Sequence, residues 1–279
     1  MIGVKTAWRT HVGKVRQVNE DRAWSGRLTD GWTAVVVADG MGGHRAGDVA
    51  SELAVGSLSD SLQDWPSGLT VEEGAARLRE MIRKANKVVY DTASLNEQYH
   101  NMGTTVVAAV LSPQGGWIGH VGDSRIYRLR GGELEQLTDD HTVINELSKS
   151  GQLSPEEAAR HPLRHAITRS VGTDRDVNPD VKAIDWLPGD RLLLCSDGLS
   201  GLVEREALRT ALAQRAGVSL DQIAQQLVEM ALDAGGDDNV TVVLVESDEA
   251  AGSMPGQSTG LATKTGGLPG KSAAGGESA

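Results

Sequence analysis

The fold class is decided by the stretch TTVVAAVLSPQGGWIGHV, residues 104–121. Its two ends, 104–111 and 117–121, are apolar runs rich in β-branched residues, which is typical of strands. The segment 112–116 between them contains Pro113 and two glycines, so it predicts a turn and the whole stretch a β-hairpin. Because the strands of a hairpin pair antiparallel, we expect an antiparallel sheet around this stretch.

Strands and helices on both sides of the hairpin extend this prediction. Further strands are expected at 32–38, 125–130, 191–196 and 240–246. Apolar side chains recur at helical spacing in three segments, 48–62, 71–94 and 220–234. Capping boxes predict helix starts at Thr70 with Glu73, Ser154 with Glu157, and Ser219 with Gln222. The pattern predicts an α+β fold in which helices cover the outer faces of antiparallel sheets.

The composition of the chain changes once, near residue 248. Residues 1–248 contain no comparable break and no internal repeat, so we expect them to form one domain. Residues 249–279 are mostly Gly, Ser, Ala and Thr, and no large apolar residue recurs among them. Such a segment cannot bury enough surface to offset its ordering entropy, so it is predicted to be a disordered tail.

The charge balance excludes several classes of function. The 279 residues include 27 Lys and Arg against 38 Asp and Glu, a formal net charge of −11. Nucleic-acid binding and electrostatic docking on anionic membranes both need a basic face, so neither is expected. No stretch reaches the ~18 apolar residues of a membrane span. The single cysteine, Cys195, cannot form an internal disulfide, and we expect a cytoplasmic protein.

Aspartates stand where several of the predicted strands begin or end. The pairs that carry them are Asp39-Gly40, Gly122-Asp123, Asp197-Gly198 and Asp238-Asn239. Each pair taken singly is typical of a turn, as we expect for Asp30-Gly31. Carboxylates brought together, however, repel one another and raise each other's pKa unless a cation lies among them. Together, the four pairs therefore indicate a metal cluster.

The ligand types predict which metal this cluster would hold. The histidines show no paired zinc spacing, whereas carboxylates with a backbone carbonyl and water suit Mg²⁺ or Mn²⁺. Two such ions a few ångströms apart would hold a bridging hydroxide and clamp a phosphoryl group for in-line displacement. Arg16, shortly before Glu20 and Asp21, offers a bidentate clamp for phosphate, although a lone arginine is also typical of a solvated surface.

Six segments stand in order along the chain: Arg16-Gln-Val-Asn-Glu-Asp21, Val37-Ala-Asp-Gly-Met-Gly-Gly-His44, Met102-Gly-Thr-Thr105, His120-Val-Gly-Asp-Ser-Arg-Ile-Tyr-Arg128, Leu194-Cys-Ser-Asp-Gly-Leu199 and Asp238-Asn-Val-Thr-Val-Val243. With these segments the chain, from Thr10 to Val245, resembles the metal-dependent type 2C serine/threonine protein phosphatases (the PPM family) in their bacterial form. The resemblance implies a four-layer α-β-β-α sandwich, with two central, mostly antiparallel sheets flanked by helices.

The resemblance also implies a role for each matching metal ligand. Asp39 matches the carboxylate that bridges two ions, and Gly40 matches the residue whose carbonyl binds the second ion. Asp197 and Asp238 match the other ligands of the first ion, and Asp123 matches a ligand of a third, weaker ion. The implied cofactor is Mn²⁺ or Mg²⁺, with two ions per chain and a third that Asp123 would bind.

Other positions match residues around the metals. Arg16 matches the phosphate-binding arginine, and Glu20 and Asp21 match carboxylates that orient metal-bound water. Asn239 flanks the site, and the region 141–166 matches a mobile flap beside it. His120, close to the Asp123 motif, is expected to be structural and paired with a neighbouring carboxylate.

One departure from the family pattern concerns the general acid. Many eukaryotic members carry a histidine directly after the Asp-Gly pair, where this chain has Met41. His44, metal-bound water and bulk solvent are each able to protonate the leaving alkoxide. The sequence leaves these three sources of the proton open.

The implied function is hydrolysis of phosphoserine and phosphothreonine in proteins by a metal-bridging hydroxide, which would counteract a eukaryotic-like serine/threonine kinase. A binding module that keeps the fold without catalysis is one alternative, disfavoured because Asp39, Asp197, Asp238 and Arg16 are all present. A metal phosphohydrolase acting on small phosphate esters is the other, and the fold does not exclude it.

Overall fold

The computed structural model describes residues 4–42, 46–112, 115–163, 166–215 and 217–247. The predicted tail, 249–279, lies outside the described residues, so the domain limits stay a prediction. His44 and the centre of the predicted hairpin turn, Pro113, lie outside them too.

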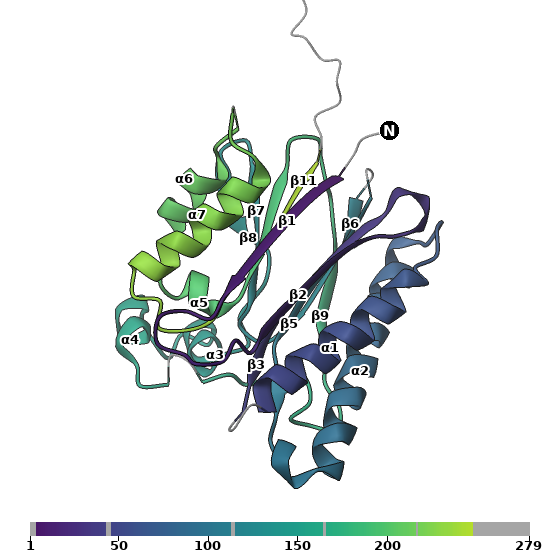
Figure 1. The fold of residues 1–279 in the computed structure, drawn as a ribbon, viewed down its shortest axis with the longest axis vertical. Helices are drawn as coiled ribbons and strands as arrows, with labels where there is room; N and C mark the ends of the chain where they lie inside the picture. The colour runs from purple at the N-terminus through teal and green to yellow at the C-terminus, as the bar shows by residue number, and fades with distance from the viewer. Residues whose placement is uncertain (1–3, 43–45, 113–114, 164–165, 216, 248–279) are drawn as a thin grey trace, which may run out of the picture. The chain divides into compact units, whose positions relative to one another are not determined.

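The described strands form two antiparallel sheets (Figure 1). The first sheet has the order β1-β11-β10-β7-β8, with bounds β1 Val4–His11, β7 Arg125–Arg130, β8 Glu133–Gln136, β10 Arg191–Cys195 and β11 Val240–Ser247. The second has the order β2-β3-β5-β6-β9, with β4 paired to β3, and bounds β2 Asp21–Arg27, β3 Thr33–Met41, β4 Gly103–Thr104, β5 Val106–Ser112, β6 Gly115–Val121 and β9 Asp180–Ile184. Every pairing is antiparallel, as the hairpin at 104–121 predicts.

Helices cover the outer faces of both sheets (Figure 1). The long helices α1 and α2 lie beside the second sheet, and α6 and α7 lie beside the first. The helical bounds are η1 Thr29–Gly31, α1 Ala46–Gln63, α2 Val71–Leu95, η2 Glu97–Tyr99, α3 Val143–Lys149, α4 Pro155–Arg160, α5 Asp197–Ser200, α6 Arg205–Leu212 and α7 Leu220–Asp233. The layers therefore run helix, sheet, sheet, helix, which confirms the predicted fold class.

The core consists of three apolar layers that follow from this stacking. The middle layer joins the two sheets through side chains such as Val35, Val107, Ile126 and Leu194, all fully buried. The other two layers lie between each sheet and its helices. Aliphatic side chains dominate all three layers, and the chain contains no Phe.

The strongest sequence signals are confirmed. The predicted capping boxes are present at the starts of α2, α4 and α7. They are formed by Thr70 with Glu73, Ser154 with Glu157, and Ser219 with Gln222. Asp30 and Gly31 both have positive φ and connect β2 to β3, as expected of a tight hairpin turn.

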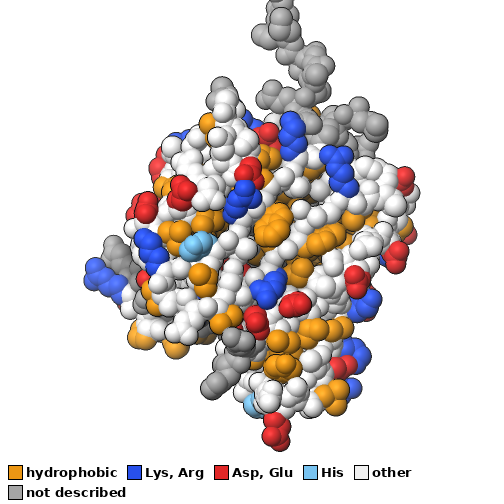
Figure 2. All heavy atoms as spheres, viewed as in Figure 1, with side chains coloured by type: hydrophobic (Ala, Val, Ile, Leu, Met, Phe, Trp, Pro, Cys, Tyr) orange, Lys and Arg blue, Asp and Glu red, His pale blue; other side chains and the backbone are white. Residues whose placement is uncertain are grey.

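Three strands, β1, β2 and β9, have no counterpart in the sequence prediction. Each lies at the edge of a sheet, where polar and charged side chains alternate with few apolar ones. The edges β1 and β2 contact each other, and apolar side chains lie among charged ones along this face (Figure 2). Because an edge strand is only half buried, it lacks the continuous apolar run that identifies a central strand.

Candidate functional site

The predicted metal ligands meet where strands of both sheets begin or end. Asp21 opens β2 and lies opposite Asp39 of β3 in the strand register. Asp123 follows β6, Asp197 begins α5 directly after β10, and Asp238 precedes β11. Charge on the other four carboxylates raises the pKa of Asp39, so each of them lies near enough to Asp39 to act on it.

The carboxylates are crowded and poorly solvated. Desolvation, followed by the charges of Asp21 and Asp197, raises the pKa of Asp39 well above its usual range. Burial raises the pKa of Asp21 to about 7 and that of Asp123 to about 7. Within the described part of the chain, Oδ1 of Asp21 is buried without a hydrogen-bond partner. Carboxylates crowded in this way raise one another's pKa, and a bound cation would relieve that repulsion.

Two glycines allow the backbone to approach closely at this site. A Cβ on Gly40 would lie 2.0 Å from the carbonyl oxygen of Gly47, at the start of α1. A Cβ on Gly198 would lie 1.9 Å from the carbonyl oxygen of Asn239. The turns that carry Asp197 and Asp238 can therefore touch only because residue 198 has no side chain.

Asn239 holds three backbone groups of the N-terminal loop. Its side-chain oxygen accepts a hydrogen bond from the Glu20 amide at 2.7 Å, and its Nδ2 donates to the carbonyls of Val12 at 2.9 Å and Val18 at 3.0 Å. The loop that carries Arg16 is thereby tied to the start of β11. Asn239 flanks the site, as the resemblance implies, and its contacts are those of a scaffold residue.

Glu20 lies at the α1 side of the cluster. Its amide and carbonyl are fixed by Asn239 and by the Gly40 amide, which donates to the Glu20 carbonyl at 3.1 Å. Burial and the charge of Asp48 raise the pKa of the Glu20 carboxyl. Glu20 and Asp21 thus face the cluster from one strand end, where they are able to accept hydrogen bonds from water.

Arg16 stands at the rim of an open cavity of about 910 Å³. Its lining includes Asp123, Asp197 and Asp238 together with residues of α3. The Nη2 atom of Arg16 donates to Oδ2 of Asp238 at 2.8 Å, and the Arg16 side chain is 51% exposed. A phosphorylated ligand in this cavity would reach both the guanidinium and the carboxylate cluster.

Several hydroxyl groups that hydrogen-bond to Asp39, to Asp21 or to one another were not identified from the sequence. The Asp39 amide donates to Oγ1 of Thr105 at 3.0 Å, and this hydroxyl lies 2.7 Å from Oγ of Ser124. Oγ of Ser196 donates to Oδ2 of Asp21 at 2.8 Å, which connects the two sheets. Ser124 and Ser196 neighbour Asp123 and Asp197 in the sequence, and Thr105 lies in the segment 102–105 of the family resemblance, so the sequence held a usable signal for each.

The general acid is not identified by the described residues. Met41, which replaces the histidine of eukaryotic members, is the last residue of β3. His44 lies outside the described residues, so the three sources of a proton stay open.

A model of the family described as protein phosphatase 2C matches residues 10–232, which is most of the chain and includes every predicted metal ligand except Asp238. This chain belongs to the protein phosphatase 2C family. Within the family, a protein named serine/threonine phosphatase stp from Listeria monocytogenes is 40% identical over 241 residues, which cover 86% of this chain and 95% of the relative.

Solved structures of serine/threonine phosphatases share the fold. The structure from S. agalactiae superposes with a TM-score of 0.81 at 36% identity and covers 87% of this chain and 99% of that one. The catalytic domain of a phosphatase named PstP, solved in complex with two manganese ions, superposes with a TM-score of 0.78 at 35% identity and covers 89% of this chain and 100% of that one.

Proposed function

We propose that this member of the protein phosphatase 2C family hydrolyses phosphoserine and phosphothreonine in proteins, in a metal-dependent reaction at the Asp39 cluster. The observation that carries the proposal is the convergence of Asp21, Asp39, Asp123, Asp197 and Asp238, whose mutual repulsion calls for bound cations. Catalysis with divalent metals is the established use of such a carboxylate arrangement.

The ligand set supports Mn²⁺ or Mg²⁺. Oxygen donors are what these ions prefer, and the related PstP catalytic domain was solved with two manganese ions. We assign Asp39 to both ions, Asp197 and Asp238 to the first, the Gly40 carbonyl to the second, and Asp123 to a third. When bound, the ions would supply Lewis-acid activation of water and of the phosphoryl group.

The protein's own residues bind and orient the reactants. The Arg16 guanidinium is placed to engage phosphoryl oxygens bidentately, which positions the phosphorus atom over the cluster. Glu20 and Asp21 accept hydrogen bonds from water and orient it for in-line attack. Phosphoryl charge would be neutralised by bound cations in place of solvent, and such electrostatic stabilisation is usually the largest contribution to catalysis.

The partners proposed for this activity are phosphorylated proteins and a eukaryotic-like serine/threonine kinase whose products the enzyme would dephosphorylate. We propose a cytoplasmic location for the reaction. Among the helices of the described residues, none is long and apolar enough to cross a membrane. The net charge of −11 further disfavours nucleic acid as a ligand.

The proposal is tested by phosphate release from a phosphothreonine peptide. Activity should require Mn²⁺ and disappear with a chelator. Asp39→Asn and Asp238→Asn should each lower the rate of phosphate release by at least about 100-fold, since acid–base and metal contributions to catalysis are typically of this size or larger. Asp60→Asn, an exposed aspartate of α1, is the matched control and should keep full activity.

Activity that survives chelation, or that persists in both active-site variants, would contradict the two-metal assignment. A small aromatic phosphate ester assayed in parallel separates the remaining alternatives. Preference for the peptide by kcat/KM supports a protein phosphatase, and preference for the ester supports a general phosphohydrolase. A protein that binds Mn²⁺ without turnover would be the non-catalytic binding module.

A further inference from the structure

The turn that carries Asp123 is held by a segment distant in sequence. Gly122 has a φ of +103°, a conformation that glycine adopts readily, and it directs the following residue into the cavity. Asp123 itself is 8% exposed. Residues 139–141, which we call the clasp, lie against this turn and contact it at three consecutive positions.

His141 binds both backbone polar groups of Gly122. The Gly122 amide donates to Nδ1 of His141 at 3.1 Å, and the His141 amide donates to the Gly122 carbonyl at 3.0 Å. His141 is 2% exposed, so water does not compete for these bonds. One histidine therefore fixes the peptide groups on both sides of the Gly122 Cα, directly before Asp123.

The other two clasp residues bind the flanks of the same turn. The Asp140 carboxylate accepts three hydrogen bonds from the Arg125 guanidinium, at 2.6, 2.9 and 3.1 Å. The Asp139 carbonyl lies 2.9 Å from Nε2 of His120, which donates to it. His120 thus pairs with a backbone carbonyl and not with a carboxylate, which corrects the sequence expectation.

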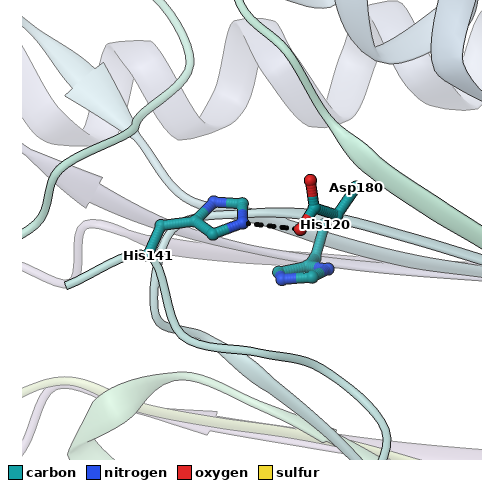
Figure 3. A group of neighbouring side chains, drawn as sticks. All are labelled: His120, His141 and Asp180. Carbon is teal, nitrogen blue, oxygen red and sulfur yellow. Dashed lines mark hydrogen bonds and ion pairs between the residues drawn. The ribbon is translucent and has the colours of Figure 1, made fainter. Parts of the chain in front are cut away.

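The outer side of His141 is held by Asp180 (Figure 3). Because Nδ1 of His141 accepts the Gly122 amide, its proton resides on Nε2, which donates to Oδ2 of Asp180 at 3.3 Å. Arg169 in turn donates to the other Asp180 oxygen at 3.1 Å. Asp180 therefore fixes the tautomer that lets His141 hold Gly122.

A bound metal ion is the alternative explanation for the grouping of His120, His141 and Asp180. Ligand atoms of His120, His141 and Asp180 lie within 4.8 Å of one another. However, a cation on Nε2 of His141 would move the proton to Nδ1, where it would face the Gly122 amide donor. The positive charge of Arg169 acts on both histidines and also disfavours a cation. The hydrogen bonds thus account for the cluster without a metal.

We propose that His141, oriented by Asp180, is a positioning residue that holds Asp123 in the geometry required for the weakest metal ion of the active site. The inference rests on the proposed function, because it takes Asp123 as a metal ligand. Groups that orient a ligand from outside the coordination sphere typically change metal affinity 10–100-fold when removed. The two ions assigned to Asp39, Asp197 and Asp238 do not depend on this contact.

Two substitutions separate the contact from general packing. His141→Asn places an amide oxygen near the position of Nδ1, so it keeps the acceptor for Gly122 and loses the bond to Asp180. His141→Gln reaches toward Asp180 and leaves the Gly122 amide without its acceptor. Asp180→Asn keeps an acceptor for Nε2, whereas Asp180→Ala removes it; Asp180 is 44% exposed, so neither change disturbs the core.

The measurement is Mn²⁺ binding to the full chain, freed of metal and titrated by calorimetry, with the unfolding temperature recorded for each variant. We expect His141→Gln to weaken the weakest class of sites about 10–100-fold. His141→Asn and Asp180→Asn should stay close to the unsubstituted protein, and Asp180→Ala should weaken the same class. The Mn²⁺ affinities of the tighter sites should be unchanged in all four variants.

Equal weakening in His141→Asn and His141→Gln would overturn the inference, because the residue would then act through packing alone. Unchanged binding in both His141→Gln and Asp180→Ala would overturn it as well. Asp123→Asn is titrated in parallel. If it binds Mn²⁺ as the unsubstituted protein does, Asp123 is not a ligand and the inference fails, while the chelator assay still decides the proposed function independently.

Discussion

Arg16 and Asp238 form an ion pair at the cavity rim, with side chains 51% and 38% exposed. Exposed pairs of this kind contribute at most about 1 kcal/mol, because water and salt screen them. Little free energy is therefore lost when the Arg16 guanidinium leaves Asp238 to bind a phosphoryl group. Arg16 is consequently available to substrate, and Asp238 is available to a metal, without rearrangement of the buried structure.

Arg16→Ala should raise KM for a phosphopeptide about 10–100-fold, because a hydrogen bond to a charged group contributes about 1.5–3 kcal/mol. Mn²⁺ affinity should not fall, since the substitution removes a positive charge from beside Asp238. Arg16→Lys should be intermediate, because lysine keeps the charge and loses the bidentate fork. Steady-state kinetics with calorimetric Mn²⁺ titration provide the check, and a matching loss of metal affinity would refute the assigned role.

At the scale of the elements, α2 packs on the second sheet through a small cluster of aromatic side chains. The ring centroids of Trp32 and Trp117 are 5.4 Å apart with an interplanar angle of 20°. Nε1 of Trp117 donates to the Val71 carbonyl at 2.9 Å, which fixes the indole under the first turn of α2. Gly74 lies directly over this indole, so the helix approaches the sheet closely at that point.

Gly74→Ala should destabilise the protein although alanine is the better helix former. Its Cβ would lie 2.2 Å from the Trp117 ring, and overpacking of this kind typically costs about 1–3 kcal/mol. Gly56→Ala in α1 is the matched control, because its Cβ would meet nothing within 4 Å, and it should stabilise by about 0.5–1 kcal/mol.

Thermal unfolding checks this pair, with about 2–4 °C expected per kcal/mol in a chain of this size. Phosphatase activity at 25 °C should be unchanged in both variants, because α2 lies away from the carboxylates. If the unfolding temperature shifted in the same direction in both variants, the close contact between residue 74 and Trp117 would be ruled out.

At the scale of the whole molecule, folding concentrates acidic groups that the unfolded chain keeps apart. The sheets bring five carboxylates to one site in a chain that already carries a net charge of −11. Self-repulsion of this kind destabilises the compact state. Two divalent ions would offset four of these charges, so metal binding and stability are expected to be linked.

The metal-free protein should lose stability as the pH rises from 6.5 to 8. Burial raises the folded-state pKa of Asp21 and of Asp123 to about 7, so the folded state holds protons that the unfolded state has released. That contribution to stability is complete at low pH and is lost as the pH rises through 7. Each such carboxyl accounts for roughly 1 kcal/mol over this interval.

Two buried histidines act in the opposite sense at lower pH. Burial lowers the pKa of His120 and of His141 to about 4, so their contribution to stability rises with pH through the unfolded-state value of about 6.5 and is nearly complete above about 7.5. Over the interval from 6.5 to 8, the remaining rise from the two histidines is about half of the loss from the two carboxyls, so the carboxyls decide the sign. Unfolding temperatures with chelator should fall over it, and the increase caused by Mn²⁺ should grow. An unfolding temperature that rises with pH in the chelated protein would disprove the linkage.

Local chemistry in the sequence determined much of this protein. Capping boxes such as Thr70 with Glu73, tight-turn pairs such as Asp30-Gly31 and apolar runs such as 191–195 each act over a few residues. They predict elements without knowledge of their neighbours, and the motifs between them identify the family. The roles assigned to the site residues and the tail at 249–279 stay predictions.

Only the tertiary structure decided how these pieces meet. The edge strands β1 and β2 lack an apolar run, so their pairing depends on register with β11 and β3. Gly122 and His141 are 19 residues apart, and the Glu20 amide and Asn239 are 219 residues apart. Such contacts follow from strand register and sheet packing, and no short stretch of sequence encodes either. The carboxylates thus share one site because two sheets stack with their ends aligned.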